Sequence, residues 1–364
     1  MSEKKQNILI CPLEWGLGHS ARMMPVAARL RDMKNNIFIG AGEIHLSFFR
    51  NEMQGLSFIN FPGFKPAYSK HLPQYVSLFL QIPFLLYHSV REHFRLKKII
   101  REYSVDIVIS DNRFGLWNRN VKTVYITHMP VIPFPQALSF LEFTGILLHR
   151  AIIKKYTYCF IPDLPGKINL SGRLSHGVKL HINVRFIGIL SRFSEMNSTT
   201  DETLKKFRHN TVILSGPEPQ REILKQKLID ILKDKEPLSV FFEGKPEEEE
   251  KSISLNNIIF YTHLASSGMA ELIKGSETIV TRSGYTTVME LISLKCSALL
   301  IPTPGQTEQE YLARYLEEKG WFTTLLQKDL NENISLPHNK SLDTDEILVQ
   351  SEALLDKALK ELSE

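Results

Sequence analysis

Short apolar runs alternate with helical patterns along the whole chain. Many of the runs are apolar on both faces, as expected for parallel strands that are buried under helices. The strand-like runs are residues 7–13, 36–42, 56–61, 105–110, 123–128, 158–162 and 184–190, then 211–216, 239–244, 258–264, 278–284, 298–303 and 323–327. Helical patterns lie between them, for example over 218–234, 307–319 and 345–362. This alternation predicts an α/β fold built from doubly wound, Rossmann-like sheets.

The chain is long enough for two such sheets. Its 364 residues exceed the roughly 250–300 at which a single core stops growing. A polar, loop-like stretch near 186–200 separates the two halves. We therefore predict an N-terminal domain over 1–188 and a C-terminal domain over 189–364 that face each other across a cleft. The last helix can alternatively pack back on the N-terminal domain. Ligands of such sheets bind outside the carboxyl ends of the strands.

The composition narrows the class of protein. Hydrophobic residues make up 43% and charged residues 23%, as in a globular protein. No run reaches the roughly 18 apolar residues of a membrane span, and the first residues lack a signal-peptide pattern. Three cysteines without a CxxC motif predict no disulfide framework. We expect a cytoplasmic protein.

The small net charge of +4 hides a division between the halves. Residues 1–190 contain 24 Lys and Arg against 11 Asp and Glu, so the remaining residues are acidic overall. A basic half suggests an anionic substrate, an anionic membrane or nucleic acid as its partner. No Lys/Arg cluster with interleaved aromatic residues supports nucleic acid, so we do not expect that partner.

A glycine-containing turn follows the first strand. Gly16, Gly18 and His19 lie between that strand and the first helix. Glycines at such a turn let the backbone approach a ligand at the positive end of a helix, although a tight turn alone would also explain them. Ala21 stands where a dinucleotide-binding fingerprint requires its third glycine, which weakens an NAD or FAD interpretation. His19 is a candidate base near neutral pH.

Three turns of the second half combine small and polar residues after a strand. They contain Ser215 and Gly216, then Arg282, Ser283, Gly284, Tyr285 and Thr286, then Gln306, Glu308 and Gln309. The free N–H groups of a helix start can hold a phosphate, and amide or carboxyl groups can bind sugar hydroxyls. Glu290, one turn inside a helix, is placed to accept hydrogen bonds from a ribose or to complement the helix dipole.

Together these motifs resemble family 28 of the GT-B glycosyltransferases, which includes the N-acetylglucosamine transferase of the peptidoglycan precursor. The Gly16–His19 turn with Arg22 and Pro25 resembles the family's glycine-rich loop. Gly188 and Arg192 match the spacing of its interdomain Gly-x-x-x-Arg, whose arginine contacts the nucleotide. The block from Arg282 to Glu290 resembles its signature, in which the glutamate binds ribose. Met269 lies in a segment that resembles the one whose backbone contacts the uracil in the family. Gln309 falls where the family has a glutamine that contacts the donor sugar.

The resemblance implies a metal-independent hexosyltransferase that uses no cofactor. The donor would be a UDP-linked nucleotide-sugar that carries N-acetylglucosamine or another hexose. The acceptor would be lipid-linked or a glycan, and transfer would invert the anomeric centre. His19 is the leading base, and Asp111 and His128 are the alternatives; for His128 a buried structural role is equally plausible. Glu14 and Trp15 depart from the family's glycine-rich loop. Nucleotide-sugar 2-epimerases and nucleotide-sugar hydrolases share the architecture and remain alternatives.

Two apolar segments of the basic half bear on the acceptor. Residues 72–90 contain Pro83, and residues 138–153 are followed by Lys154 and Lys155. Both can be buried helices, which is the favoured interpretation of the second. An apolar surface rimmed by Lys and Arg would instead dock on an anionic bilayer. With the basic half, this predicts peripheral contact with the inner face of the cytoplasmic membrane, and a role in the cell envelope.

Overall fold

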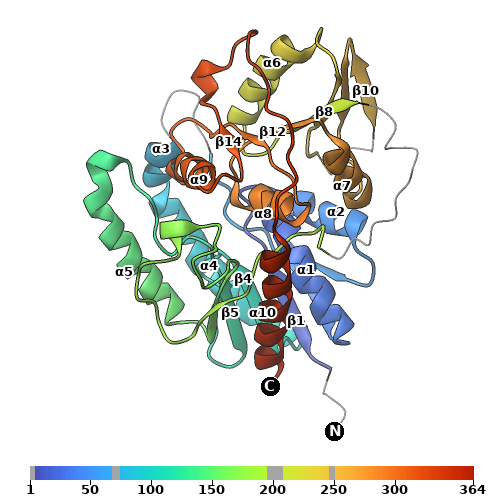
Figure 1. The fold of residues 1–364 in the computed structure, drawn as a ribbon. Helices are drawn as coiled ribbons and strands as arrows, with labels where there is room; N and C mark the ends of the chain where they lie inside the picture. Colours follow the sequence, from blue (N-terminus) through green and yellow to red (C-terminus); the bar gives the residue numbers. More distant parts are fainter. Residues whose placement is uncertain (1–4, 68–73, 195–207, 246–250) are drawn as a thin grey trace. The chain divides into compact units, whose positions relative to one another are not determined.

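The computed structural model describes residues 5–67, 74–194, 208–245 and 251–364 (Figure 1). It divides into two compact units. Unit 1 contains the chain up to Pro66, Phe79–Leu190 and Asp345–Glu364, and unit 2 contains Ala67–Leu78 and Ser191–Thr344, as far as these residues are described. The change between the units at 190/191 falls within the predicted polar boundary, of which residues 195–200 lie outside the described residues.

Unit 1 is built on a seven-stranded parallel sheet. The strands are β1 (Asn7–Cys11), β2 (Asn36–Ala41), β3 (Ser57–Asn60), β4 (Ile107–Asp111), β5 (Lys122–Ile126), β6 (Tyr158–Ile161) and β7 (Val184–Phe186), in the order β3-β2-β1-β4-β5-β6-β7. Its helices include α1 (Gly18–Asp32), α2 (Glu43–Glu52), α4 (Ile82–Glu102), α5 (Glu142–Ile153) and α10 (Asp345–Ser363). Because the strand order reverses between β1 and β4, the loops after these two strands flank the position where such sheets bind ligands.

Unit 2 has a similar strand order, with an additional strand at one edge. Its strands are β8 (His209–Ile213), β9 (Leu238–Phe242), β10 (Ser252–Leu255), β11 (Ile258–Tyr261), β12 (Thr278–Thr281), β13 (Leu299–Leu300) and β14 (Thr323–Thr324), in the order β10-β11-β9-β8-β12-β13-β14. Helices α6 (Gln220–Leu232), α7 (Ser266–Gly275), α8 (Tyr285–Ser293) and α9 (Thr307–Glu318) connect them. Only β10 pairs antiparallel among the described strands of this sheet. The order again reverses at one place, between β8 and β12.

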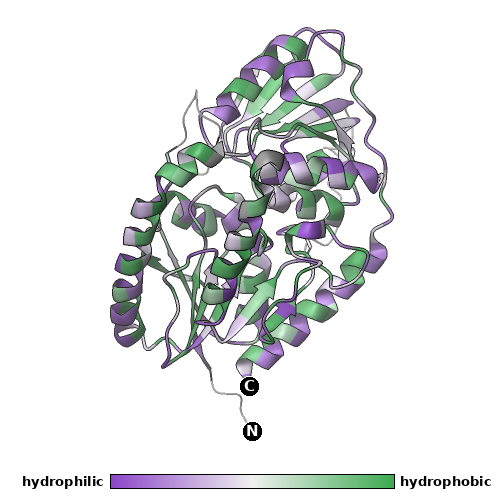
Figure 2. Cartoon of the chain, turned by 90° about the vertical axis from the view of Figure 1, so that its left-hand side faces the viewer, coloured by the Kyte–Doolittle hydropathy of each residue, from purple (hydrophilic) through white to green (hydrophobic). Residues whose placement is uncertain are grey.

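The apolar runs of the sequence form the interiors of both sheets. Ile8, Leu9 and Ile10 of β1 are fully buried, and the strands are mostly green in the hydropathy view while many helices are part green and part purple (Figure 2). Burial on both faces is what a parallel sheet covered by helices requires. Each of the thirteen predicted runs overlaps a strand, so the predicted α/β class with two doubly wound sheets is confirmed.

The last helix, α10, belongs to unit 1. Arg185 of β7 forms an ion pair with Glu361 at 2.6 Å, and the Nζ of Lys122 donates to the carbonyl of Leu362 at 2.9 Å. Gly188 has φ +74°, and a Cβ there would lie 2.2 Å from the Cα of Ser351. A glycine is therefore required at residue 188, where the chain passes α10 closely.

The two apolar segments do not form buried helices. They contain α3 (Gln74–Leu80), the first part of α4, and α5. Phe84 and Tyr87 of α4 and Phe143 and Leu148 of α5 are exposed. The favoured interpretation of residues 138–153 as a buried helix is therefore wrong, because only one side of α5 is covered. No helix among the described residues is long and apolar enough to cross a membrane.

Candidate active site and nucleotide site

In unit 1, the loops after β1 and β4 bring two predicted residues into contact. His19 lies in the first turn of α1, and Asp111 is the last residue of β4. The Nδ1 of His19 is 2.8 Å from an Oδ of Asp111. The His19 side chain is 19% exposed whereas that of Asp111 is fully buried. The imidazole therefore reaches the surface while its carboxylate partner lies beneath it.

Arg22, one helical turn after His19, is bonded to the other two candidate catalytic side chains, Asp111 and His128. Its Nε donates to Asp111 at 3.0 Å, and a second guanidinium nitrogen forms an ion pair with the other carboxylate oxygen. Its Nη1 is 3.2 Å from the Nδ1 of His128, which follows β5. Arg22 is 1% exposed. The sequence motif includes Arg22 without indicating its role; its i+3 spacing from His19 was the available signal.

The charges around Asp111 determine the protonation states of Asp111 and His19. Burial raises the pKa of the Asp111 carboxyl, but Arg22 and His19 outweigh burial and lower the pKa to about 2. Burial and the Arg22 charge lower the pKa of His19, and Asp111 only partly opposes them. A carboxylate accepts hydrogen bonds, so Nδ1 of His19 carries the proton and Nε2 keeps its lone pair. The result is a neutral imidazole that is held in one tautomer.

His128 has a different environment. A guanidinium can only donate hydrogen bonds, so the Nδ1 of His128 is the acceptor of the bond from Arg22. The proton of neutral His128 therefore lies on Nε2. This tautomer can donate a hydrogen bond to an oxygen, but accepting a proton at Nδ1 would break the bond to Arg22.

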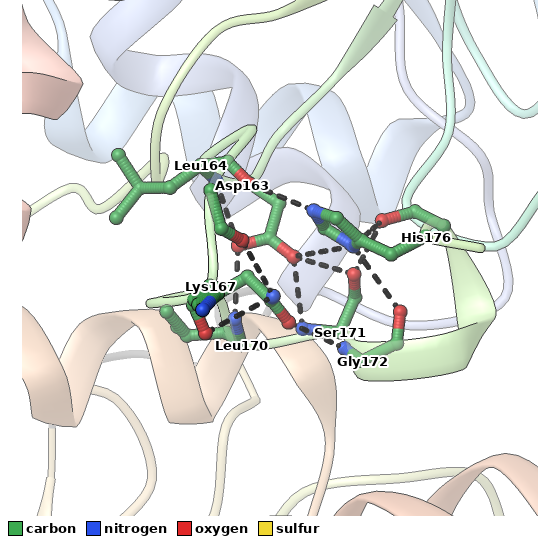
Figure 3. A network of polar contacts seen from close by, with 10 residues as sticks. Asp163, Leu164, Lys167, Leu170, Ser171, Gly172 and His176 are labelled. Carbon is green, nitrogen blue, oxygen red and sulfur yellow. Dashed lines mark hydrogen bonds and ion pairs between the residues drawn. The ribbon is translucent and has the colours of Figure 1, made fainter.

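A second polar network follows β6 (Figure 3). Fully buried Asp163 accepts hydrogen bonds from the backbone N–H groups of Leu164, Leu170 and Ser171 at 2.8–2.9 Å. Burial raises the pKa of Asp163, and these bonds oppose the rise. The N–H of Val131 donates to the carbonyl of Leu174 at 2.9 Å. The network thus fixes the loop after β6, to which the loop after His128 is bonded.

In unit 2, three residues from separate predicted motifs meet. The Nε of Arg192 donates to an oxygen of Glu290 at 2.9 Å, and its Nη2 lies 3.1 Å from the sulfur of Met269. The side chains of Arg192 and Glu290 are 10% and 8% exposed. Glu290 is on α8, one turn after the loop that follows β12, and Met269 is on α7. The arrangement leaves little of either charge in contact with solvent.

The Arg282 side chain does not reach the surface. Its guanidinium donates to the carbonyls of Ile301, Pro302 and Gln220 at 2.8–3.3 Å. Burial lowers the pKa of Arg282 to about 10. Arg282 therefore connects the loops after β12 and β13 to the start of α6. Any contact of Arg282 with a ligand would have to come from its backbone.

Ser283 and Gln309 also make internal contacts. The Ser283 hydroxyl donates to the carbonyl of Gln309 at 2.8 Å, and the Gln309 side-chain oxygen accepts from the N–H of Thr303 at 2.9 Å. The side-chain oxygen of nearby Gln306 is buried without a hydrogen-bond partner among the described residues. Of these amides, Gln306 is the one with an acceptor available for a ligand.

The remaining predicted residues lie at the same edges of the two sheets. They are Gly16 and Gly18 in unit 1, and Ser215, Gly216, Gly284, Tyr285, Thr286 and Glu308 in unit 2. Gly216 has φ +96°, and no atom lies within 4 Å of the position a Cβ would take at Gly16 or Gly216. Both loops are open at these glycines. Their contact with a ligand stays a prediction.

The described part of the chain contains no group of three or more His, Cys, Asp or Glu side chains that could hold a metal ion. Independence from metal stays a prediction, as does the absence of a cofactor. The polar contacts described above are the His19–Asp111 pair in unit 1 and the Arg192–Glu290 pair in unit 2.

Comparisons with known proteins agree with these motifs. Residues 223–348 match the model of the glycosyltransferase family 28 C-terminal domain. A UDP-N-acetylglucosamine--N-acetylmuramyl-(pentapeptide) pyrophosphoryl-undecaprenol N-acetylglucosamine transferase 2 of Bacillus thuringiensis (strain Al Hakam) is 35% identical over 122 residues, which are 33% of this chain and 32% of that protein. An uncharacterized glycosyltransferase of Methanosarcina acetivorans is 25% identical over 245 residues, 62% of this chain and 60% of that protein. The chain thus spans about a third of the first relative.

Solved structures match over almost the whole length. The glycosyltransferase SnogD from Streptomyces nogalater has 13% sequence identity and a TM-score of 0.55, covering 99% of this chain and 100% of that one. The spinosyn rhamnosyltransferase SpnG has 12% identity and a TM-score of 0.58, covering 98% and 95%. At this identity the likeness concerns the fold. The chain therefore has the GT-B fold of two Rossmann-like domains, and residues 223–348 confirm its resemblance to family 28 glycosyltransferases.

Proposed function

We propose that this chain is a glycosyltransferase that moves a hexose from a UDP-sugar to a hydroxyl of a lipid-linked or glycan acceptor, with inversion. The observation that carries the proposal is the His19–Asp111 pair at the strand-order reversal of unit 1, in a chain whose residues 223–348 match a glycosyltransferase domain. Unit 1 would supply the base, and unit 2 would bind the nucleotide-sugar.

His19 is the best base of the three candidates. Its Nδ1–H is directed to Asp111, so Nε2 can accept the proton of an acceptor hydroxyl. Asp111, with a pKa of about 2 and bonds to Arg22, is too weak a base. His128 already accepts a bond from Arg22 at Nδ1, so taking up a proton there would break that bond, and His128 is less suited to act as the base. Asp111 then orients His19 and stabilises the imidazolium that forms.

The transfer step balances with these groups. The acceptor oxygen forms a bond to the anomeric carbon as the bond from that carbon to the diphosphate oxygen breaks. The proton of the hydroxyl goes to Nε2 of His19, and the nucleoside diphosphate leaves with the bonding electron pair. Attack opposite the leaving group inverts the anomeric centre. The positive N-terminal ends of α6 and α8, with Arg192, would stabilise the leaving diphosphate without a metal.

The donor side of the proposal uses the Arg192–Glu290 pair. Glu290 would accept hydrogen bonds from the ribose hydroxyls, since Arg192 holds the carboxylate in place from one side. Met269 would lie near the base, and the unpartnered oxygen of Gln306 would accept from a sugar hydroxyl. Uridine and N-acetylglucosamine are favoured because several curated relatives are named as UDP-N-acetylglucosamine transferases.

A lipid-linked acceptor is favoured by the outer faces of two helices of unit 1. Phe84, Tyr87 and Phe94 of α4 and Phe143 of α5 are each more than 60% exposed. Lys97, Lys98 and Arg101 line a groove at the end of α4 together with Phe94 and Glu102, so cations outnumber the one carboxylate there. Apolar side chains beside cations suit an anionic membrane surface. We therefore propose peripheral contact with the cytoplasmic face of the membrane, and no role for nucleic acid.

Incubation with UDP-sugars alone separates transfer from its alternatives. A thermal-shift panel of nucleotides and UDP-sugars first identifies the donor, because a ligand that binds only the folded state raises the melting temperature. Transfer predicts that the bound UDP-sugar stays intact until an acceptor lipid extract is added. Free UDP without acceptor would instead indicate a nucleotide-sugar hydrolase, and an altered sugar would indicate a 2-epimerase. Absence of any nucleotide-induced shift would contradict the proposal.

A further inference from the structure

Helix α4 has two faces with different surroundings. Phe84, Tyr87, Val90 and Phe94 form its outer face, with exposed fractions of 57–64%. They recur at helical spacing, so they lie along one side of the helix. Glu92 and Leu96, on the other side, are buried. The helix therefore presents apolar side chains outward and a carboxylate inward, where a charge requires a partner.

The partner of Glu92 comes from the loop that follows Asp111. The Nη2 of Arg113 donates to Glu92 at 3.1 Å, with the two side chains 1% and 7% exposed. The Nη1 of Arg113 donates to the carbonyls of Gly40 and Phe61 at 3.0–3.1 Å. A buried ion pair with these added bonds is costly to break. Arg113 thus fixes α4 and the ends of β2 and β3 to one point of the loop.

Three further contacts hold the loop close to α4. A Cβ at Gly115 would lie 2.1 Å from the carbonyl oxygen of Ser89, so α4 passes the loop at a distance that only glycine permits. The Nδ1 of His93 is 3.1 Å from the carbonyl of Gly115, and its ring stacks on Trp117 at 4.2 Å. The inner face of α4 therefore contacts the loop at residues 113, 115 and 117.

The loop itself leaves Asp111 little freedom to move separately. The Ser110 hydroxyl donates to the carbonyl of Arg113 at 2.7 Å, and the Tyr156 hydroxyl donates to the same carbonyl at 2.8 Å. The Tyr125 hydroxyl donates to Asn112 at 3.0 Å. A short, well-bonded segment therefore joins the contact with α4 to the residue that orients His19.

We propose that Glu92 and Arg113 are positioning residues through which α4 fixes Asp111, so that a bilayer on the outer face of α4 acts on the His19–Asp111 pair. The coupling rests on the proposed function, in which His19 is the base and α4 docks on a membrane. The coupling would make the His19–Asp111 pair sensitive to membrane docking. The same helix would contact the bilayer with its outer face and fix Asp111, which orients the base, with its inner face.

The titration of His19 in Glu92→Gln measures the positioning without any substrate. His19 faces Arg22 on its own helix, Asp111 on β4 and His128 after β5, and it also interacts electrostatically with His45 on α2. Asp111 raises the His19 pKa, so a displaced Asp111 lets that pKa fall. NMR of histidine-labelled protein follows the titration. We expect the His19 midpoint to fall by about half a pH unit or more, which is roughly a threefold change in the protonation constant.

A matched control separates positioning from a general loss of stability. Glu361→Gln breaks the partly exposed ion pair with Arg185 in the same unit and should leave the His19 midpoint unchanged. A folded Glu92→Gln variant with an unchanged midpoint would refute the positioning. If Glu92→Gln does not fold, Arg113→Lys takes its place, since it keeps the buried positive charge but loses the forked hydrogen bonds to Glu92, Gly40 and Phe61. An unchanged His19 midpoint in that variant would refute the positioning.

Hydrogen–deuterium exchange with vesicles of phosphatidylglycerol and phosphatidylcholine tests the membrane step. Bound vesicles should slow exchange in residues 84–96 and, through the coupling, in residues 110–118. In Glu92→Gln only the first segment should respond. Protection confined to 84–96 in the unsubstituted chain would refute the coupling while docking stands. Failure of the vesicles to bind in flotation would refute docking, and the His19 titration would still decide the positioning.

Discussion

Replacement of Asp111 by asparagine tests the charge arrangement of the candidate active site most sharply. The substitution keeps the size of a fully buried side chain and removes its charge. His19 then loses its anionic partner, and Arg22, which is 1% exposed, is left without the carboxylate that compensates it. We expect Asp111→Asn to lower both the stability of the protein and the rate of transfer.

The magnitude follows from the pKa of Asp111. The pKa falls from its ordinary value of 3.8 to about 2 on folding, which is worth about 2 kcal/mol at neutral pH. Because the folded pKa is the lower one, this stability is present above about pH 4 and is lost as pH falls toward 2. A second estimate of the same loss comes from Arg22, which is left unpaired: breaking a buried ion pair by removing one partner costs about 3–5 kcal/mol. A total loss of about 2–5 kcal/mol is expected at pH 7.

Urea unfolding of the unsubstituted chain and of Asp111→Asn at pH 7 and pH 3 measures this loss. The difference in the free energy of unfolding should shrink at pH 3. Asp356→Asn, which breaks a partly exposed ion pair with Arg29, is the control and should cost less than about 1 kcal/mol. A loss below about 0.5 kcal/mol for Asp111→Asn at pH 7, or an equal loss at both pH values, would refute this arrangement of charges around Asp111.

Three further measurements address the base, the nucleotide site and the loop contacts. Because burial and Arg22 lower the pKa of His19, the acid limb of the pH–rate profile should have its midpoint below 6.5; a midpoint above it would exclude His19 as the base. Glu290→Ala should weaken UDP binding about tenfold or more in calorimetry, as for a lost hydrogen bond to a charged group, and unchanged affinity would refute the ribose assignment. Arg282→Met should lower the free energy of unfolding by about 3 kcal/mol, since three buried carbonyls lose their donor, and a neutral result would contradict its structural role.

The fold was predictable because buried parallel strands are apolar on both faces. Thirteen runs of this kind each overlap a strand. Strand β10 was missed because its sequence, SISL, alternates polar and apolar residues, and all four residues are exposed at an antiparallel edge. Helix α5 was misjudged because mean hydropathy does not reveal which side of a helix is covered, and four apolar side chains in or next to it face outward: Phe140, Phe143, Leu147 and Leu148.

The candidate site was predictable in position but not in its contacts. The ends of parallel strands meet at one edge of a sheet, so His19 and Asp111 could be expected near each other. That Arg22 joins Asp111 to His128 depends on the lateral order β1-β4-β5, which cannot be read from the chain. Glu92 gave no signal, because a glutamate among the charged residues of a helix is ordinarily exposed. Its burial follows only from the close approach of α4 to the loop after β4.

Transfer and nucleotide binding, measured together in the single substitution His19→Asn, test the proposed catalytic role of His19 most directly. The unsubstituted chain, given radiolabelled UDP-sugars and a membrane lipid extract, should move label into the lipid phase and release UDP in equal amount. In His19→Asn the transfer should fall by about a hundredfold or more, the contribution of a general base, while UDP binding to unit 2 stays unchanged. Transfer by His19→Asn at the rate of the unsubstituted chain would contradict the assignment of His19 as the base.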